Sequence, residues 1–262
     1  MEENTLVVLP TFNERENVGR VVDALMRHLR CSVLVVDDES PDGTGDLAEE
    51  LAVAHPGRIQ VMHRRGPRGL GRAYVDGLRR ALATSAPVIV QMDCDLSHDP
   101  AALPAIVEQL RDADLAIGSR YVPGGRIVNW PVRRQMLSAF ANRYVRSITR
   151  LRVRDCTSGY RAWRRQALAA TMAHGFGSDG YSFLVEMLYA AVAVGCRVAE
   201  SPITFVERRF GESKLSSKVL LESAITPWRL AFARQTRPAA PVAAQAFQPV
   251  PVERSTTAAV VD

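Results

Sequence analysis

Two aspartates separated by a single residue, Asp93 and Asp95, follow one apolar run of the chain, and an adjacent pair, Asp37 and Asp38, follows another. If both runs are strands of a parallel sheet, the acids lie at the carboxyl ends of those strands, where such sheets bind ligands. Two carboxylates at one strand end can share a hard divalent cation such as Mg²⁺ or Mn²⁺, with diphosphate and water oxygens in the remaining positions. The spacing therefore predicts a metal–diphosphate site. The alternative is that these short acidic runs only cap helices.

The basic residues gather later in the chain. Between Arg120 and Arg165 there are twelve arginines, and Asp155 is the only acid. Arg120 directly follows the fifth predicted strand, beside the predicted metal, and Lys214 lies in a Gly-x-Ser-Lys loop suited to contacting phosphate. For most of the other arginines a solvated basic surface is the simpler interpretation. The order of charges predicts an acidic half that holds a cation and a basic half that faces phosphate.

The overall composition excludes several classes of protein. The chain has 262 residues, of which 47% are hydrophobic and 23% charged, so it is neither a disordered, a collagen-like nor a disulfide-scaffold chain. Lys and Arg number 33 against 28 Asp and Glu, and this excess favours polyanionic partners. Nucleic acid is not expected among them, because the sequence has no aromatic-interleaved sheet motif and no recognition-helix signature.

Compartment signals are few. The cysteines are widely spaced and form no C-x-x-C pair, so we expect reduced thiols and no zinc site. They are Cys31, Cys94, Cys156 and Cys196. The acidic N-terminus runs straight into a strand pattern, and no run of about 20 apolar residues occurs, so we expect neither a signal peptide nor a membrane-spanning segment. The expected location is the cytoplasm.

Strand and helix patterns alternate through the first half of the chain. The expected strands are Thr5–Leu9, Ser32–Val36, Ile59–His63, Val88–Met92 and Leu115–Gly118. The expected helices run from Asn13 to about Leu29, from the turn at Ser40–Gly43 to about Ala54, from Gly71 to Ala83 and from Pro100 to Leu110. Strands that are apolar throughout, alternating with helices of about 10–15 residues, indicate a parallel sheet covered on both faces.

The second half is less regular. We expect helices over Arg133–Arg150 and Tyr181–Gly195 and a strand over Val198–Val206. The segment Arg237–Asp262 is rich in Ala, Pro, Gln and Val without any period, and is predicted to be a disordered tail.

One motif resembles a dinucleotide-binding fingerprint and fails it. In Gly69-Leu-Gly71-Arg-Ala-Tyr74 the third glycine is replaced by tyrosine, and five residues separate the strand end at His63 from Gly69. No Walker loop, G-x-S-x-G or H-E-x-x-H motif is present. His98, after the second aspartate pair, is interpreted as a loop residue rather than a ligand or base.

Six motifs in order along the chain resemble one family. They are Pro10-Thr-Phe-Asn-Glu-Arg-Glu16, Val35-Val-Asp-Asp-Glu-Ser-Pro-Asp-Gly43, Met92-Asp-Cys-Asp-Leu-Ser-His98, Gly118-Ser-Arg-Tyr121, Thr157-Ser-Gly-Tyr-Arg161 and Phe205-Val-Glu-Arg-Arg-Phe-Gly-Glu-Ser-Lys-Leu215. They resemble the dolichol- or polyprenol-phosphate mannosyltransferases, family 2 glycosyltransferases of the GT-A fold. The resemblance implies a GT-A domain over residues 1–236, with a nucleotide-binding half of about 1–118 and an acceptor-binding half of about 119–236, followed by the tail 237–262.

The implied reaction is transfer of mannose from GDP-mannose to a polyprenyl phosphate, with inversion, to give a β-mannosyl phosphoryl lipid. A polyprenyl-phosphate glucosyltransferase that uses UDP-glucose is the alternative, because donor choice rests on pocket shape. A non-catalytic binding module for a nucleotide sugar or for nucleic acid is the alternative from another class. The intact D-x-D and G-x-S-K-L loops favour the enzyme.

The resemblance also implies roles for individual residues. Those implied to bind the donor are Pro10, Phe12, Glu14, Val36, Asp38, Asp93, Cys94, Asp95, Arg120, Arg208 and Lys214. Those implied for the acceptor phosphate are Arg120, Arg134 and Ser138, the metal ligands are Asp93 and Asp95, and the catalytic residues are Asp95 and Arg120. Three positions depart from the family pattern: Phe12 replaces the commoner Tyr, Cys94 should contribute mainly backbone, and Ser97 stands where some relatives carry a metal-binding Gln, so it is a doubtful ligand.

Two further expectations concern the lipid acceptor. Its phosphate is largely ionised at neutral pH, since the second pKa of a phosphate monoester is about 6, so no dedicated catalytic base is expected. Its tail lies in a bilayer, and two segments have the pattern of interfacial helices: Arg133–Arg150, with an apolar stripe and arginines beside it, and Val219–Phe232, which contains Trp228. Ordinary core packing is the alternative for both stripes. We expect peripheral attachment to the cytoplasmic membrane face, or docking to a separate membrane-spanning partner.

Overall fold

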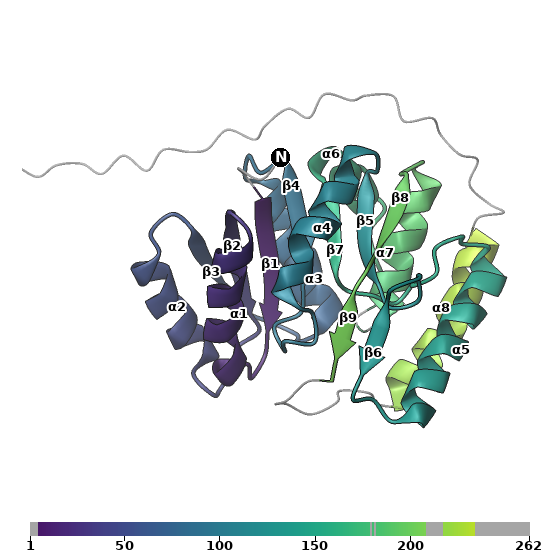
Figure 1. Ribbon diagram of the computed structural model, residues 1–262, viewed down its shortest axis with the longest axis horizontal. Coiled ribbons are helices and arrows are strands. Elements are labelled where there is room, and N and C mark those ends of the chain that lie inside the picture. Colours follow the sequence, from purple (N-terminus) through teal and green to yellow (C-terminus); the bar gives the residue numbers. More distant parts are fainter. Residues whose placement is uncertain (1–4, 179, 181, 208–216, 234–262) are drawn as a thin grey trace, which may run out of the picture.

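The computed structural model describes residues 5–178, 180, 182–207 and 217–233. Its centre is a seven-stranded sheet with the strand order β3-β2-β1-β4-β7-β5-β8 (Figure 1). The strands are β1 (Thr5–Thr11), β2 (Cys31–Asp37), β3 (Ile59–His63), β4 (Val88–Gln91), β7 (Arg161–Arg164), β5 (Leu115–Ser119) and β8 (Val198–Pro202). Neighbouring strands are parallel except for β7, which is antiparallel to both β4 and β5. The predicted mostly parallel, Rossmann-like sheet is confirmed.

Helices cover both faces of this sheet, as the apolar strands require. All seven residues of β1 are buried, which fits a strand with a packed layer on each side. One face carries α1 (Arg15–His28), α2 (Thr44–Ala54) and α4 (Leu103–Glu108), the last lying between the 3₁₀ turns η2 (Pro100–Ala102) and η3 (Gln109–Arg111). The other face carries α3 (Leu70–Leu82), α6 (Arg165–Met172) and α7 (Ser182–Ala193). Two apolar cores result, one on each side of the sheet.

Helix α3 lies unusually close to the sheet. A Cβ at Gly77 would be 2.7 Å from Val8 and 2.8 Å from Val36, which is closer than van der Waals contact allows. Only glycine therefore lets this turn of α3 approach β1 and β2 so closely. The approach fixes the depth of the neighbouring turn, which contains Tyr74.

A smaller layer lies at one end of the molecule. The strands β6 (Arg126–Val128) and β9 (Thr204–Val206) pair in parallel, and the helices α5 (Val132–Thr149) and α8 (Ser217–Ala233) pack side by side, far from α1 and α2 (Figure 1). The single strand predicted over Val198–Val206 is therefore two strands. Pro202 ends β8 because it has no N–H to continue the ladder, and the chain then pairs with β6.

Some elements were not predicted, and some predicted features fall outside the described residues. Neither β7 nor α6 is predicted from the sequence. The expected tail at 237–262 and the phosphate-binding candidates Arg208 and Lys214 lie outside the described residues. None of the helices in the described part of the chain is both long and apolar enough to span a bilayer.

Candidate active site

The carboxyl ends of β1, β2 and β4 meet at one edge of the sheet. Thr11 at the end of β1 pairs with Asp37 at the end of β2, and β4 flanks β1 on its other side. The chain runs outward from β1 in both directions, toward β3 and toward β5, so the boundary between β1 and β4 is the switch point at which such sheets bind ligands. The predicted metal carboxylates lie in the turn directly after β4.

Each of these two carboxylates has one oxygen engaged by a protein hydroxyl. Oδ1 of Asp93 accepts a hydrogen bond of 2.6 Å from the hydroxyl of Tyr74 on α3. Oδ1 of Asp95 accepts hydrogen bonds from the backbone N–H of Ser97 at 3.0 Å and from its hydroxyl at 2.5 Å. The hydroxyl of Ser97 thus bonds Asp95 and fixes the orientation of its carboxylate.

Cys94 lies between the two aspartates. It is 2% exposed, and burial, followed by the charge of Glu14, raises the pKa of its thiol well above the ordinary value. Only the backbone of Cys94 is therefore available to a ligand.

Strained backbone and buried rings fix this turn. Leu96 has a φ of 61°, a left-handed conformation that costs a bulky residue about 1–2 kcal/mol and that clusters at functional sites. His98 is 2% exposed and stacks on Tyr160 at a centroid distance of 4.9 Å. Its Nδ1 accepts the backbone N–H of Asp93 at 3.1 Å, which puts the proton of the neutral ring on Nε2. The ring therefore holds the backbone of Asp93.

The donor set fits a diphosphate-bound divalent cation. Within the described ranges, no group of three or more His, Cys, Asp or Glu side chains could hold a metal ion. The two carboxylates after β4 would supply only part of a coordination shell, and the rest would come from phosphate and water oxygens. The side chain of Asp93 is 27% exposed, so a ligand can reach it from solvent.

Arg120, predicted to contact phosphate, is held by a buried acid. Its Nε and Nη2 donate to the two oxygens of Asp155 at 2.7 Å each, and its backbone N–H donates to Oδ2 at 3.0 Å. Nη2 also donates to Thr157 Oγ1 at 2.8 Å. Burial alone would lower the pKa of Arg120, but the charge of Asp155 outweighs it, so the pKa is raised; Asp93 contributes to the same effect. Arg120 is thus a fixed cation within electrostatic reach of Asp93.

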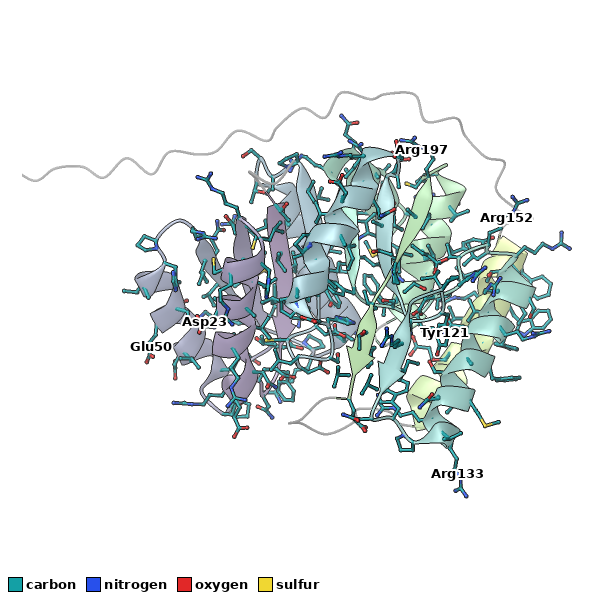
Figure 2. The ribbon with its side chains drawn as sticks, viewed as in Figure 1. Asp23, Glu50, Tyr121, Arg133, Arg152 and Arg197 are labelled. Atoms are coloured by element: carbon teal, nitrogen blue, oxygen red, sulfur yellow. The ribbon has the colours of Figure 1, made fainter. Side chains whose placement is uncertain are left out.

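The inner face of α5 is tied to the same region. Asn142 donates to Thr157 Oγ1 at 3.2 Å and accepts the backbone N–H of Cys156 at 2.8 Å. The predicted acceptor residue Ser138 accepts the hydroxyl of Tyr121 at 2.7 Å, and Figure 2 shows Tyr121 between the sheet and α5. The other predicted acceptor residue is Arg134. Its guanidinium carbon lies 3.9 Å from the centroid of the Trp130 ring, and its Nη1 pairs with Oε1 of Glu207 at 2.7 Å. The structure therefore brings both residues to the side of the site that α5 forms.

The sequence comparisons identify the family. The model of glycosyl transferase family 2 matches residues 6–171. The chain is 46% identical over 225 residues to the polyprenol monophosphomannose synthase of Mycolicibacterium smegmatis, and the match covers 84% of each chain. It is 45% identical over 232 residues to the undecaprenyl-phosphate mannosyltransferase of Micrococcus luteus, covering 86% of this chain and 94% of that one.

The chain belongs to glycosyl transferase family 2.

Solved structures agree at the level of the fold. The glucosyl-3-phosphoglycerate synthase of Mycobacterium tuberculosis, in complex with Mn²⁺, UDP and glucosyl-3-phosphoglycerate, has a TM-score of 0.57 at 20% identity and covers 90% of this chain and 81% of its own. A mannosyltransferase of Pyrobaculum calidifontis, in complex with GDP-mannose and Mn²⁺, has a TM-score of 0.50 at 18% identity and covers 90% and 75%. This glycosyltransferase therefore has the GT-A fold expected from its sequence.

The residues implied to hold the nucleotide lie on β1, β2 and the turns after them. Pro10 and Val36 are buried in the strands, and the half-buried ring of Phe12 lies 4.7 Å below the guanidinium of Arg68. Asp38 is 5% exposed; its Oδ1 pairs with Arg64, and its Oδ2 accepts the N–H of Gly69 at 2.9 Å. The carboxylate of Asp38 thus orders the loop before α3 in this glycosyltransferase. Its contact with a nucleotide stays a prediction.

The remaining nucleotide candidate, Glu14, precedes α1. Its Oε2 accepts the amide N–H of Asn17 at 2.7 Å, and its backbone N–H donates to Thr44 Oγ1 at 2.9 Å. The turn after β1 is therefore joined to the start of α2.

Two residues that the sequence did not mark as functional contact the site. Tyr74 bonds Asp93, and Asp155 holds Arg120. The sequence nevertheless set both residues apart. Tyr74 stands in place of the third glycine of the dinucleotide-binding fingerprint, and Asp155 is the only acid between Arg120 and Arg165, a segment with twelve arginines.

An apolar surface lies on the outer side of α5 and α8. We call it the α5–α8 surface; its exposed side chains are Val132, Met136, Leu137 and Phe140 on α5 and Ile225, Trp228 and Phe232 on α8. Phe140 stacks on Tyr144 at 6.3 Å, and the hydroxyl of Tyr144 accepts the indole N–H of Trp228 at 2.9 Å, so the two helices form one continuous surface. The stripe predicted on Arg133–Arg150 is divided, because Val145 packs into the core while Leu137 and Phe140 are 56% and 65% exposed. Contiguous exposed apolar side chains mark interaction sites.

Proposed function

We propose that the protein transfers mannose from GDP-mannose to a polyprenyl phosphate with inversion of the anomeric centre. The observation that carries the proposal is a fixed guanidinium, Arg120, at the same carboxyl edge of the GT-A sheet as the carboxylates Asp93 and Asp95. The relatives at 45% and 46% identity are named for mannosyl transfer to prenyl phosphates. A second cation, Arg134, lies on α5, the helix whose inner face contacts the loop that holds Arg120, and would bind the acceptor phosphate.

Asp93 and Asp95 would hold Mg²⁺ or Mn²⁺ together with the donor diphosphate. When bound, the ion stabilises the negative charge that develops on the departing diphosphate. Asp93 keeps its orientation through Tyr74, and Asp95 keeps its own through Ser97. The two solved structures named above contain Mn²⁺, one with UDP and one with GDP-mannose, which supports the choice of ion.

The reaction is one displacement in which an oxygen of the acceptor phosphate forms a bond to the anomeric carbon. The bond from that carbon to the diphosphate oxygen breaks, and GDP leaves with the electron pair. Because the acceptor phosphate is already largely dianionic near pH 7, no proton has to be removed from it. The chain's task is to bring two anions together, and Arg120, fixed by Asp155, would offset their repulsion and align the attacking oxygen.

The α5–α8 surface would place the site at a membrane. Four arginines on or next to α5 are exposed around its apolar residues, namely Arg133, Arg143, Arg146 and Arg150. Figure 2 shows Arg133 pointing outward at the end of α5. An apolar face bordered by arginines suits an anionic bilayer surface. We therefore propose peripheral attachment on the cytoplasmic face, where the lipid phosphate is presented.

A donor panel tests the reaction. GDP-mannose and UDP-glucose are each incubated with one short polyprenyl phosphate, with Mg²⁺, with Mn²⁺ or with EDTA, and release of the nucleoside diphosphate is measured. We expect metal-dependent release of GDP that requires the acceptor. Faster release of UDP than of GDP would identify the glucosyltransferase instead, and release without acceptor would contradict transfer to lipid.

Flotation with anionic vesicles tests the attachment. The double variant L137D/F140D should lose most of the vesicle-bound fraction, while V53D, which changes an 80% exposed valine on α2, should not. Equal flotation of L137D/F140D and the unmodified protein would contradict the assignment of this surface. Absence of flotation of the unmodified protein would leave only a separate membrane-spanning partner.

A further inference from the structure

Tyr74 is a completely buried tyrosine whose hydroxyl reaches out to the site. Its side chain is 0% exposed and stacks on Phe183, with ring centroids 6.3 Å apart and an angle of 13° between the rings. The close approach of α3 at Gly77, one turn further on, fixes the position of the ring relative to the sheet. Its hydroxyl donates to Oδ1 of Asp93 at 2.6 Å, the short distance of a bond between a hydroxyl and a carboxylate.

This bond determines which oxygen of Asp93 can face a ligand. With Oδ1 held by Tyr74, Oδ2 remains 4.0 Å from Nδ1 of His98, beyond hydrogen-bond distance. The backbone of Gly159 lines another side, because a Cβ there would lie 3.5 and 3.6 Å from the two oxygens. Asp93 is therefore confined on three sides, by His98 of its own turn and by Tyr74 and Gly159, which are distant from it in the sequence.

A purely structural role for the hydroxyl would need no carboxylate. Tyr160 is equally buried, at 0% exposure, and its hydroxyl donates to the backbone carbonyl of Asp99 at 3.1 Å. A backbone carbonyl thus satisfies a buried tyrosine in the same region. The hydroxyl of Tyr74 instead bonds a side chain that is partly open to solvent and that water could otherwise solvate.

We infer that Tyr74 is a positioning residue for metal binding, which directs Asp93 to coordinate the cation through Oδ2 alone. The inference rests on the metal site at Asp93 and Asp95 that the proposed function contains. Residues behind the ligands of metal sites fix ligand orientation, and their loss typically weakens metal affinity about 10- to 100-fold. Ser97 holds Oδ1 of Asp95 in a similar way from within the turn.

Binding of Mn²⁺ in the presence of GDP, measured by electron paramagnetic resonance of the free ion, tests this without turnover. Tyr74→Phe keeps the ring and its stacking and removes only the donor. We expect the dissociation constant for Mn²⁺ to rise about 10-fold or more, and the kcat at saturating Mn²⁺ to change less than the metal dependence. Tyr160→Phe is the matched control, because it also removes one buried hydroxyl bond; its affinity should stay within about twofold of the unmodified protein.

A double-mutant cycle separates positioning from a general loss of structure. In an Asp93→Asn background, Tyr74→Phe should cause no further loss of Mn²⁺ affinity, because its partner carboxylate is already gone. Additive losses, unchanged affinity in Tyr74→Phe, or an equal loss in Tyr160→Phe would each overturn the inference. If the unmodified protein binds no Mn²⁺ in the presence of GDP, the proposed metal site fails as well, and this result differs from each of the others.

Discussion

An arginine–aspartate ion pair lies at each end of strand β5, and only one of the two pairs is buried. At its amino end Arg197 donates from Nε, Nη2 and the backbone N–H to Asp114, at 3.1, 3.3 and 2.9 Å. At its carboxyl end Arg120 donates from the same three groups to Asp155, at 2.7, 2.7 and 3.0 Å. The side chains of the first pair are 65% and 26% exposed, those of the second 7% and 0%. Figure 2 shows Arg197 at the top of the molecule and Tyr121, the neighbour of Arg120, well below it.

The difference teaches that burial, and not pairing geometry, separates a structural pair from a site pair. An exposed pair gains little, because water solvates both charges when it opens. A buried pair cannot open without leaving a desolvated charge, so it fixes the guanidinium in one orientation. The carboxyl edge of the sheet holds the buried pair together with Asp93 and Asp95, the carboxylates proposed to hold a metal, and the amino edge holds the exposed pair. Four predictions sharpen this contrast.

The largest effect is expected from Asp95→Asn at the carboxyl edge. The substitution keeps the shape of the side chain and removes the charge that would hold the cation and, through it, the donor diphosphate. We expect kcat/KM for GDP-mannose to fall by about 10³-fold or more, with a circular dichroism spectrum like that of the unmodified protein. Transfer at a near-normal rate would contradict the assignment of the D-x-D turn to the donor.

Asp155→Asn should give the next largest effect. It leaves the buried Arg120 without its carboxylate, so we expect a loss of about 3 kcal/mol in the free energy of unfolding and about 10²-fold in turnover. Urea unfolding and transfer kinetics measure the two effects. The double variant Asp155→Asn with Arg120→Gln removes both charges and should recover stability without recovering activity. Recovery of both together would show that the pair serves only the fold.

Acidification should remove the stability that the buried pair contributes. Burial alone would raise the pKa of Asp155, but Arg120 outweighs it and holds the pKa below its usual range. A depressed carboxyl pKa contributes stability that is present above the unfolded value of about 3.9 and is lost as the pH falls through the folded value. The gap in unfolding free energy between the unmodified protein and Asp155→Asn should therefore narrow from about pH 5 downward. Urea titrations at several pH values measure it, and a gap independent of pH would refute the prediction.

The smallest effect is expected from Asp114→Asn at the amino edge. The pKa of Asp114 is also lowered, with Arg197 outweighing the effect of burial, but both side chains have solvent beside them. The melting temperature should fall by less than about 2 °C and transfer should stay unchanged, since exposed pairs contribute little. A loss of activity like that of Asp155→Asn would remove the distinction between the two ends of β5.

The sequence predicted those parts of the fold whose signal is local. The five strands of the first half and the helices between them follow from apolar runs and helical periods, and the D-x-D turn follows from its place after β4. Strand β7 was missed because Arg161-Ala-Trp-Arg164 begins and ends with arginine. Arg161 is nevertheless 0% exposed, and burial lowers its pKa to about 10, a cost that only the surrounding fold can offset.

Only part of the site could be predicted, because only some of its residues are marked by a local sequence signal. Asp93, Asp95 and Arg120 could be placed because each lies within four residues of the carboxyl end of a strand of the sheet. Their holders could not, since Tyr74 is 19 residues from Asp93 and Asp155 is 35 residues from Arg120, and no spacing rule joins such positions. The sequence predicted both segments, α5 and α8, as helices with an apolar stripe, but which of their side chains face outward depends on how the two helices pack against each other.

The two-sided character of α5 has a consequence for the choice of lipid. Its inner face contacts the loop that holds Arg120, through Asn142 and Thr157, and its outer face belongs to the α5–α8 surface. With that surface on a bilayer, as proposed, α5 separates Arg120 from the membrane, and Arg120 stands one helix diameter, roughly 10 Å, above the hydrocarbon. Only the phosphate and the first few carbons of the acceptor then leave the membrane. We therefore expect the rate of transfer to depend little on the length of the prenyl chain, because on this arrangement the rest of the tail does not contact the protein.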